Sequence, residues 1–155
     1  MTRHEPRSAT ISSMNISLNQ LEKAYAALQK AEVIWLRCAS GSDADLTDIA
    51  RSGLIHNFKV AYEQSWKLLK RWMVQELSTS ESELTIRRHL YRLAAKNGLI
   101  ADVDAWWTFN EARNKSSHTY QESVALEVCG AARAFLPACQ ALINALKLQI
   151  DDSRG

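Results

Sequence analysis

Residues 111–120 read EARNKSSHTY and lie where one helical pattern ends and a long final one begins. The stretch holds an arginine, an amide, a histidine and a tyrosine within ten residues. Because each residue of a regular helix turns by about 100°, Arg113 and His118 would point about 140° apart. We therefore expect these two side chains to converge only if the helix breaks near Ser116 and Ser117, or if a second chain supplies one of them.

Two helices are predicted on either side of this stretch. Before it, Asp102 caps a helix that contains the adjacent pair Trp106 and Trp107. Since neighbouring side chains cannot point the same way, one ring should enter the core and the other should meet a loop or a partner. After the stretch, apolar residues recur at helical spacing from 124 to 150. Pro137 should kink this last helix, because its ring removes one backbone donor.

Three further helices are predicted earlier in the chain. The second covers roughly residues 48–77, and the third has Ile86 among its inward residues and ends at Gly98 in a Schellman motif. The first of these helices should start at the capping-box pair Ser17 and Gln20. The second should be capped by Asp48 or Thr47, and the third by Thr85.

The size and composition favour one helical domain. The chain has 155 residues with five glycines and two prolines, which suits long helices better than a turn-rich β fold. We expect an all-α antiparallel bundle of about five helices formed by residues 17–150. Residues 1–16 should be a flexible tail and residues 151–155 a frayed one. A second methionine, Met14, leaves the true start of the chain open.

Neither export nor a membrane is expected. Residues 1–16 lack the apolar core of a signal peptide, and no apolar run looks long enough to span a bilayer. The three cysteines, Cys38, Cys129 and Cys139, are an odd number without metal-ligand spacing, which is typical of reduced thiols. We expect a cytoplasmic protein with buried cysteines, no metal and no cofactor.

A short acidic pattern near residue 43 is expected not to be catalytic. The run Ser42-Asp43-Ala44-Asp45-Leu46 is similar to the Ser-Asp-x-Asp-Leu of nucleotidyltransferase active sites, where two carboxylates hold magnesium. That chemistry needs carboxylates fixed on a sheet, whereas the flanks here have helical patterns. We interpret the run as a solvated acidic loop.

The third predicted helix carries a stripe of cations. Arg88, Arg92 and Lys96 lie four residues apart, with Arg87 beside them. The net charge of +2 is too small to indicate nucleic-acid binding by itself, so local clusters must decide. A stripe of this kind is usually a solvated face, but its density makes it a weak candidate for RNA binding.

The pattern Arg113-x4-His118-x-Tyr120 resembles the signature of HEPN proteins, and more narrowly the branch partnered with minimal nucleotidyltransferases. The resemblance extends in order over roughly residues 18 to 150. Residues 51–70 resemble the family's second helix, and residues 85–106 resemble its middle segment. The resemblance implies a HEPN-like four-helix-bundle core and a homodimer with its Arg/His pairs at the dimer groove.

These residue types suit RNA cleavage without a metal. RNA carries its own nucleophile, the 2′-hydroxyl, so cleavage needs a general base, a general acid and positive charge for the phosphorane. Histidine suits acid–base work near neutral pH, and arginine meets two phosphate oxygens with its planar fork. A base and an acid need two histidines, and a two-fold dimer would bring two copies of His118 and Arg113 to one cleft. Asn114 would orient His118 or a phosphate.

By resemblance, the protein is the toxin half of a toxin–antitoxin pair. The partner, a minimal nucleotidyltransferase, would add adenylate to Tyr120 and block the site. One alternative is a non-catalytic substrate-binding subunit of a two-component nucleotidyltransferase, in which Arg113 and His118 bind phosphate without cleaving it. A purely structural role also stays open, since arginine and histidine are favourable near a helix C-terminus.

Overall fold

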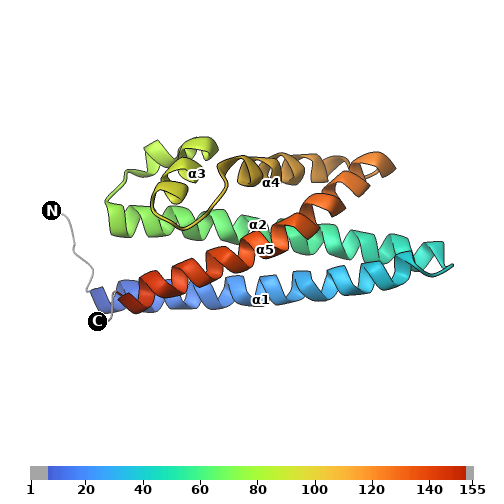
Figure 1. The fold of residues 1–155 in the computed structure, drawn as a ribbon, viewed down its shortest axis with the longest axis horizontal. Helices are drawn as coiled ribbons and strands as arrows, with labels where there is room; N and C mark the ends of the chain where they lie inside the picture. The colour runs from blue at the N-terminus through green and yellow to red at the C-terminus, as the bar shows by residue number, and fades with distance from the viewer. Residues whose placement is uncertain (1–6, 153–155) are drawn as a thin grey trace.

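The computed structural model describes residues 7–152, and in that part of the chain every element is helical (Figure 1). In chain order the elements are α1 (Arg7–Ala39), α2 (Ala44–Leu77), the 3₁₀ turn η1 (Glu81–Thr85), α3 (Arg87–Lys96), α4 (Val103–Lys115), the 3₁₀ turn η2 (Ser116–His118) and α5 (Glu122–Asp152). Five α-helices and no strand among these residues confirm the predicted all-α bundle.

The helices are arranged around one antiparallel hairpin. α1 and α2 run side by side in opposite directions, and α5 crosses them diagonally (Figure 1). α3 and α4 lie along α2, and α4 also packs on α5. The η2 turn between α4 and α5 therefore lies toward the end of the bundle that carries the α1–α2 loop.

A cluster of aromatic rings joins α2, α4 and α5. The ring of Phe135 on α5 lies with its centroid 5.2 to 6.2 Å from those of Phe58, Tyr62, Trp106 and Phe109. All four contacts are edge-to-face, the arrangement that the charge distribution of aromatic rings favours. This cluster fixes α4 against α2, and Arg113 lies in the last turn of α4.

A buried polar network adds α3 to this junction. The hydroxyl of Tyr62 donates to Oδ1 of Asn110 at 2.8 Å and accepts a hydrogen bond from the hydroxyl of Tyr91. Burial raises the pKa of Tyr62 to about 12, and burial with the neighbouring Tyr62 raises the pKa of Tyr91. Both phenols thus stay neutral and donate, which satisfies polar atoms that would be costly to bury alone.

The start of α2 differs from the expectation. Asp43 caps the helix, because its carboxylate accepts the backbone N–H groups of Asp45 and Leu46 at 3.1 Å each. The predicted caps Asp48 and Thr47 are wrong, and Thr47 instead donates its hydroxyl to the Cys38 carbonyl at 2.9 Å. A capping carboxylate at Asp43 accounts for the acidic loop without a metal.

The first helix starts earlier than predicted. α1 begins at Arg7 rather than at the capping box of Ser17, so residues 7–16 of the predicted tail are helical. Met14 is only 3% exposed and continues the buried stripe of Leu18 and Leu21 by one turn, a contribution that the sequence interpretation overlooked. Residues 151–152 belong to α5, while residues 1–6 and 153–155 lie outside the described residues.

The third helix begins without the predicted cap. Thr85 lies in η1 and donates its hydroxyl to the Ser82 carbonyl, so it does not cap α3. Ile86 precedes the helix with extended backbone and is 67% exposed, so the expectation that it points inward is wrong. At the other end, Gly98 has a φ of 75°, and the N–H of Leu99 bonds the Ala94 carbonyl at 2.9 Å. This confirms the predicted Schellman motif.

The last helix is a core helix. By length and composition Glu122–Asp151 would suffice to cross a membrane, contrary to the expectation that no run would, but 44% of its most apolar window is buried inside the bundle. Cys129 and Cys139 are fully buried in α5, as predicted, whereas Cys38 is half-buried. Pro137 lies within α5, and the kink expected there stays a prediction.

Candidate active site

The helix breaks where the sequence required it to. α4 ends at Lys115, a single 3₁₀ turn covers Ser116–His118, and α5 starts at Glu122. The buried Ser116 donates its hydroxyl to the Arg113 carbonyl, which satisfies one of the open carbonyls at the end of α4. The break confirms one of the two conditions under which Arg113 and His118 can serve one site.

Arg113 is held on one side and open on the other. Its Nε donates to Oε1 of Glu63 at 3.0 Å, and its Nη1 lies 3.5 Å from Oγ of Ser116. Its Nη2 makes no hydrogen bond to any residue between 7 and 152, and the side chain is 29% exposed. The guanidinium is therefore fixed in direction while it keeps free donors for an anion.

Glu63 on α2 is the residue that fixes this arginine, and the sequence interpretation gave it no role. Its second oxygen accepts the indole N–H of Trp66 at 3.2 Å, and Nζ of Lys67 lies 4.0 Å away. Glu63 and Arg113 are 50 residues apart, so no local spacing pairs them. The only signal was that Glu63 lies in the part of the chain that resembles the family's second helix.

His118 and Tyr120 are exposed together on the turn. Their rings meet edge to face, with centroids 6.0 Å apart and an interplanar angle of 80°. Tyr120 is 79% exposed, and its hydroxyl makes no hydrogen bond within the described part of the chain. Among the residues that the structure describes, Tyr120 therefore has neither a packed ring nor a bonded hydroxyl that would give it a structural role. His118 belongs to the same turn as Ser116 but makes no hydrogen bond to Arg113.

The turn is braced against α5 by an ion pair. Nζ of Lys115 lies 2.6 Å from Oε1 of Glu127, and this contact raises the pKa of Lys115. Asn114 is exposed and makes no side-chain hydrogen bond to another residue of the range 7–152. A role for Asn114 in orienting His118 or a phosphate thus stays a prediction.

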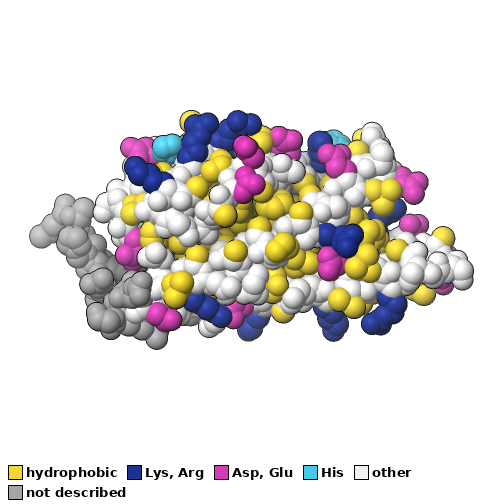
Figure 2. Space-filling model, in the orientation of Figure 1, with side chains coloured by type: hydrophobic (Ala, Val, Ile, Leu, Met, Phe, Trp, Pro, Cys, Tyr) yellow, Lys and Arg dark blue, Asp and Glu magenta, His cyan; other side chains and the backbone are white. Residues whose placement is uncertain are grey.

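The cationic stripe of α3 is exposed, as its spacing predicts. Arg88, Arg92 and Lys96 all face solvent, and Figure 2 shows Lys and Arg side chains gathered along the edge of the molecule where α3 lies. The guanidinium of Arg88 lies 4.3 Å from the ring centroid of Trp107. Trp106 enters the core as predicted, but Trp107 meets a cation of α3 rather than a loop. RNA binding by the stripe stays a prediction.

Metal-ligating side chains do not cluster in the described residues. Between 7 and 152 there is no group of three or more His, Cys, Asp or Glu placed to hold an ion. Asp43 and Asp45 lie at the start of α2, where Asp43 caps the helix. The candidate site in the described part of the chain is the Arg113–Glu63 pair with the neighbouring His118 turn.

Comparisons with known proteins agree with this fold. The family model described as "Nucleotidyltransferase substrate binding protein like" matches residues 9–148. A protein of Haemophilus influenzae (strain ATCC 51907 / DSM 11121 / KW20 / Rd) called "Probable ribonuclease HepT" is 28% identical over 136 residues, which cover 85% of this chain and 92% of that protein. A solved structure from Haemophilus influenzae, described as revealing the fold of a substrate binding domain of a nucleotidyltransferase, superimposes with a TM-score of 0.75. It is 27% identical, and the match covers 84% of this chain and 98% of that one.

Proposed function

Because this chain belongs to the nucleotidyltransferase substrate binding protein like family, we propose that it is a metal-independent endoribonuclease that acts as a homodimer. The observation that carries the proposal is the fixed guanidinium of Arg113 beside the turn that exposes His118. The relative called a ribonuclease supports the same reaction class. In this proposal two copies of the site share one cleft around a two-fold axis.

The proposed reaction uses the chemistry of RNA itself. The neutral imidazole of one His118 takes the proton of the 2′-hydroxyl as its oxygen attacks phosphorus. The protonated His118 of the second copy gives its proton to the departing 5′-oxygen as that P–O bond breaks. The products are a 2′,3′-cyclic phosphate and a 5′-hydroxyl. The free donors of Arg113 face the charge that develops on the phosphorane oxygens, and they need no reorganisation because Glu63 already fixes the guanidinium.

In the same proposal a partner nucleotidyltransferase controls the enzyme, which makes the two a toxin–antitoxin pair. The hydroxyl of Tyr120 attacks the α-phosphorus of ATP, pyrophosphate leaves, and adenylate remains as a phosphodiester on the ring. The exposure of Tyr120 and its contact with His118 support this site. The adduct places a negative charge and a purine where the RNA would enter.

Cleavage assays on a labelled RNA test the reaction. His118→Ala and Arg113→Ala should each abolish cleavage while the helical circular dichroism is unchanged. Arg113→Lys should also fail, because lysine keeps the charge but lacks the fork. The matched controls are His56→Ala and Arg37→Ala, which replace exposed residues of α2 and α1 that lie outside the site. EDTA should have no effect, and activity that chelation removes and magnesium restores would sink the mechanism.

Light scattering tests the assembly. A homodimer at micromolar concentration is expected, since one chain offers a single well-placed histidine. A monomer that cleaves RNA would contradict the shared cleft.

A second candidate is a non-catalytic subunit that holds substrate for the nucleotidyltransferase. The description of the solved relative as a substrate binding domain favours it. Expression of this chain alone separates the two candidates. Growth arrest that depends on His118 supports the ribonuclease. If this chain alone cleaves no RNA and the partner binds its substrate more tightly when this chain is present, the binding subunit is supported.

A further inference from the structure

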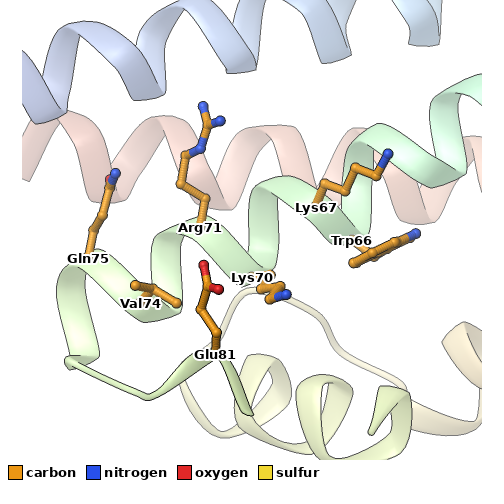
Figure 3. A pocket seen from close by; sticks show the side chains of 7 residues that line it. All are labelled: Trp66, Lys67, Lys70, Arg71, Val74, Gln75 and Glu81. Atoms are coloured by element: carbon orange, nitrogen blue, oxygen red, sulfur yellow. The ribbon is translucent and has the colours of Figure 1, made fainter. Parts of the chain in front are cut away.

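A hollow of about 430 Å³ lies beside α2, away from the η2 turn. Figure 3 shows Trp66, Lys67, Lys70 and Arg71 around it from α2, and Glu81 reaching toward it from η1. The lining thus contains a tryptophan ring and three cations, together with Val74 and Gln75, and one carboxylate opposite. Positive grooves with an aromatic wall are typical of proteins that follow the backbone of single-stranded nucleic acid.

The cations of this hollow are poorly neutralised by the protein. Lys70 is half-buried and forms no ion pair with any residue from 7 to 152, and Lys67 has only the 4.0 Å contact to Glu63. Glu81 is exposed and pairs with none of the three cations. Arg87 of α3 adds a fourth positive charge nearby, with its guanidinium 3.2 Å from the ring centroid of Trp66. The excess positive charge favours an anion as the occupant.

The hollow is physically connected to the candidate active site. Trp66 forms part of its wall and donates its indole N–H to Glu63, and Glu63 accepts from Arg113. Lys67 and Lys70 follow Glu63 along α2 by one and two helical turns, so the cations extend about 10 Å from the Glu63 level. An extended strand held at Arg113 can therefore continue along α2 into the hollow.

We propose that this hollow binds a backbone phosphate of the same single-stranded RNA whose scissile bond lies at Arg113. The proposal rests on the ribonuclease function proposed above and adds a second contact to its substrate site. Lys70 and Lys67 supply the positive charge, Trp66 supplies an apolar wall, and Glu81 weakens the site by repulsion. Because Lys70 attracts the phosphate and Glu81 repels it, removing the charge of each should change the affinity for RNA in opposite directions.

The test measures fluorescence anisotropy of an RNA of about ten nucleotides, a length in the range of known single-strand sites. His118→Ala serves as the background so that the RNA stays intact. On this background Lys70→Gln should weaken binding by about three- to tenfold and reduce the salt slope of log K by about 0.7, the value for one lost phosphate contact to a single strand. Glu81→Gln should tighten binding by about two- to fivefold, because it removes a like charge from the strand.

The matched controls are Lys30→Gln and Glu76→Gln, two exposed residues that lie outside the hollow and should leave binding unchanged. If Lys70→Gln and Glu81→Gln both match these controls, or the background binds no RNA, the hollow is not an RNA subsite. Inorganic phosphate and AMP are tested as competitors of RNA binding. If either one saturates the hollow without weakening RNA binding, the proposed RNA subsite is also overturned. Wild-type protein that binds through Lys70 but never cleaves would defeat the ribonuclease function and leave the RNA subsite standing.

Discussion

Three of the four tyrosines of the chain fall into two groups that differ in burial and in hydrogen bonding. At the junction of α2, α3 and α4, Tyr62 and Tyr91 are buried, and their hydroxyls are paired with each other and with Asn110. On the turn after α4, Tyr120 is 79% exposed and its hydroxyl has no partner in the described residues. The first group holds helices together, and the second leaves a reactive group accessible. The same residue type therefore serves structure in one place and suits modification in the other.

Arg113 lies at the border between these two regions. Asn110, one turn earlier on α4, belongs to the buried network, while His118 follows on the exposed turn. Arg113 itself bonds Glu63 on the buried side and keeps Nη2 open. The fold thus fixes the guanidinium of Arg113 and leaves the imidazole of His118 exposed. Four substitutions test this difference.

The largest effect is expected from Trp106→Ala in the buried junction. The ring is 2% exposed and touches Tyr91, Phe109 and Phe135, so its removal leaves a cavity among close-packed aromatic side chains. The free energy of unfolding should fall by about 3–5 kcal/mol. Tyr120→Ala, which removes an exposed ring, should change it by no more than about 0.5 kcal/mol. Urea denaturation measures both, and equal losses would erase the distinction between the two regions.

The next effect is expected in alkali. The pKa of Tyr62 is about 12 in the folded protein, whereas that of an unfolded tyrosine is about 10. Between these values the unfolded chain loses the proton and the folded chain keeps it. The contribution of Tyr62 to the free energy of unfolding should therefore be level below pH 10 and then fall by up to about 1.4 kcal/mol per pH unit. Denaturation at a series of pH values should show a shallower fall for Tyr62→Phe, and an unchanged slope would contradict the burial argument.

The sequence predicted more of the fold than of the site, and the reason is the range of the interactions. The Schellman stop at Gly98, the cap at Asp102 and the break after Lys115 each depend on a few neighbouring residues, and each was correct. The Arg113–Glu63 pair and the Tyr62–Asn110 bond join residues 50 and 48 positions apart.

Local errors had a different origin. Asp43 was taken as a solvated loop residue because Asp48 and Thr47 also have capping chemistry, and only the backbone direction decides among them. Met14 was assigned to a tail because one apolar residue ahead of a capping box is a weak signal. The break of the helix between Arg113 and His118 was the part of the site that helix geometry alone anticipated.

A smaller effect on stability is expected from Glu63→Ala. The pair with Arg113 is partly exposed, so its loss should lower the free energy of unfolding by no more than about 1 kcal/mol. Cleavage should fall about tenfold, mainly in kcat, because the guanidinium loses its fixed direction. Glu63→Gln keeps an oxygen that accepts from Nε and should recover part of the rate. Glu127→Ala, which breaks the ion pair with Lys115 instead, is the control, and an equal loss of cleavage there would remove the special role of Glu63.

The smallest effect on the fold and on cleavage is expected from Tyr120→Phe. The change removes one exposed hydroxyl that bonds to no described residue, and it keeps the ring that meets His118. The free energy of unfolding and the rate of RNA cleavage should both match those of the wild type. The variant should differ only when the partner nucleotidyltransferase and ATP are present, because phenylalanine offers no oxygen for the adenylate.

Intact mass gives the decisive measurement for that last variant. Wild-type chain should gain the mass of adenylate and lose cleavage in step with it, while Tyr120→Phe should gain no mass and stay active. Tyr25→Phe, a change on α1 far along the chain from the turn, should behave as the wild type does. Adenylate on Tyr120 that leaves cleavage intact would contradict the proposed control of the enzyme. If Tyr120, His118 and Arg113 share one cleft, a phosphodiester on Tyr120 should block an RNA phosphate.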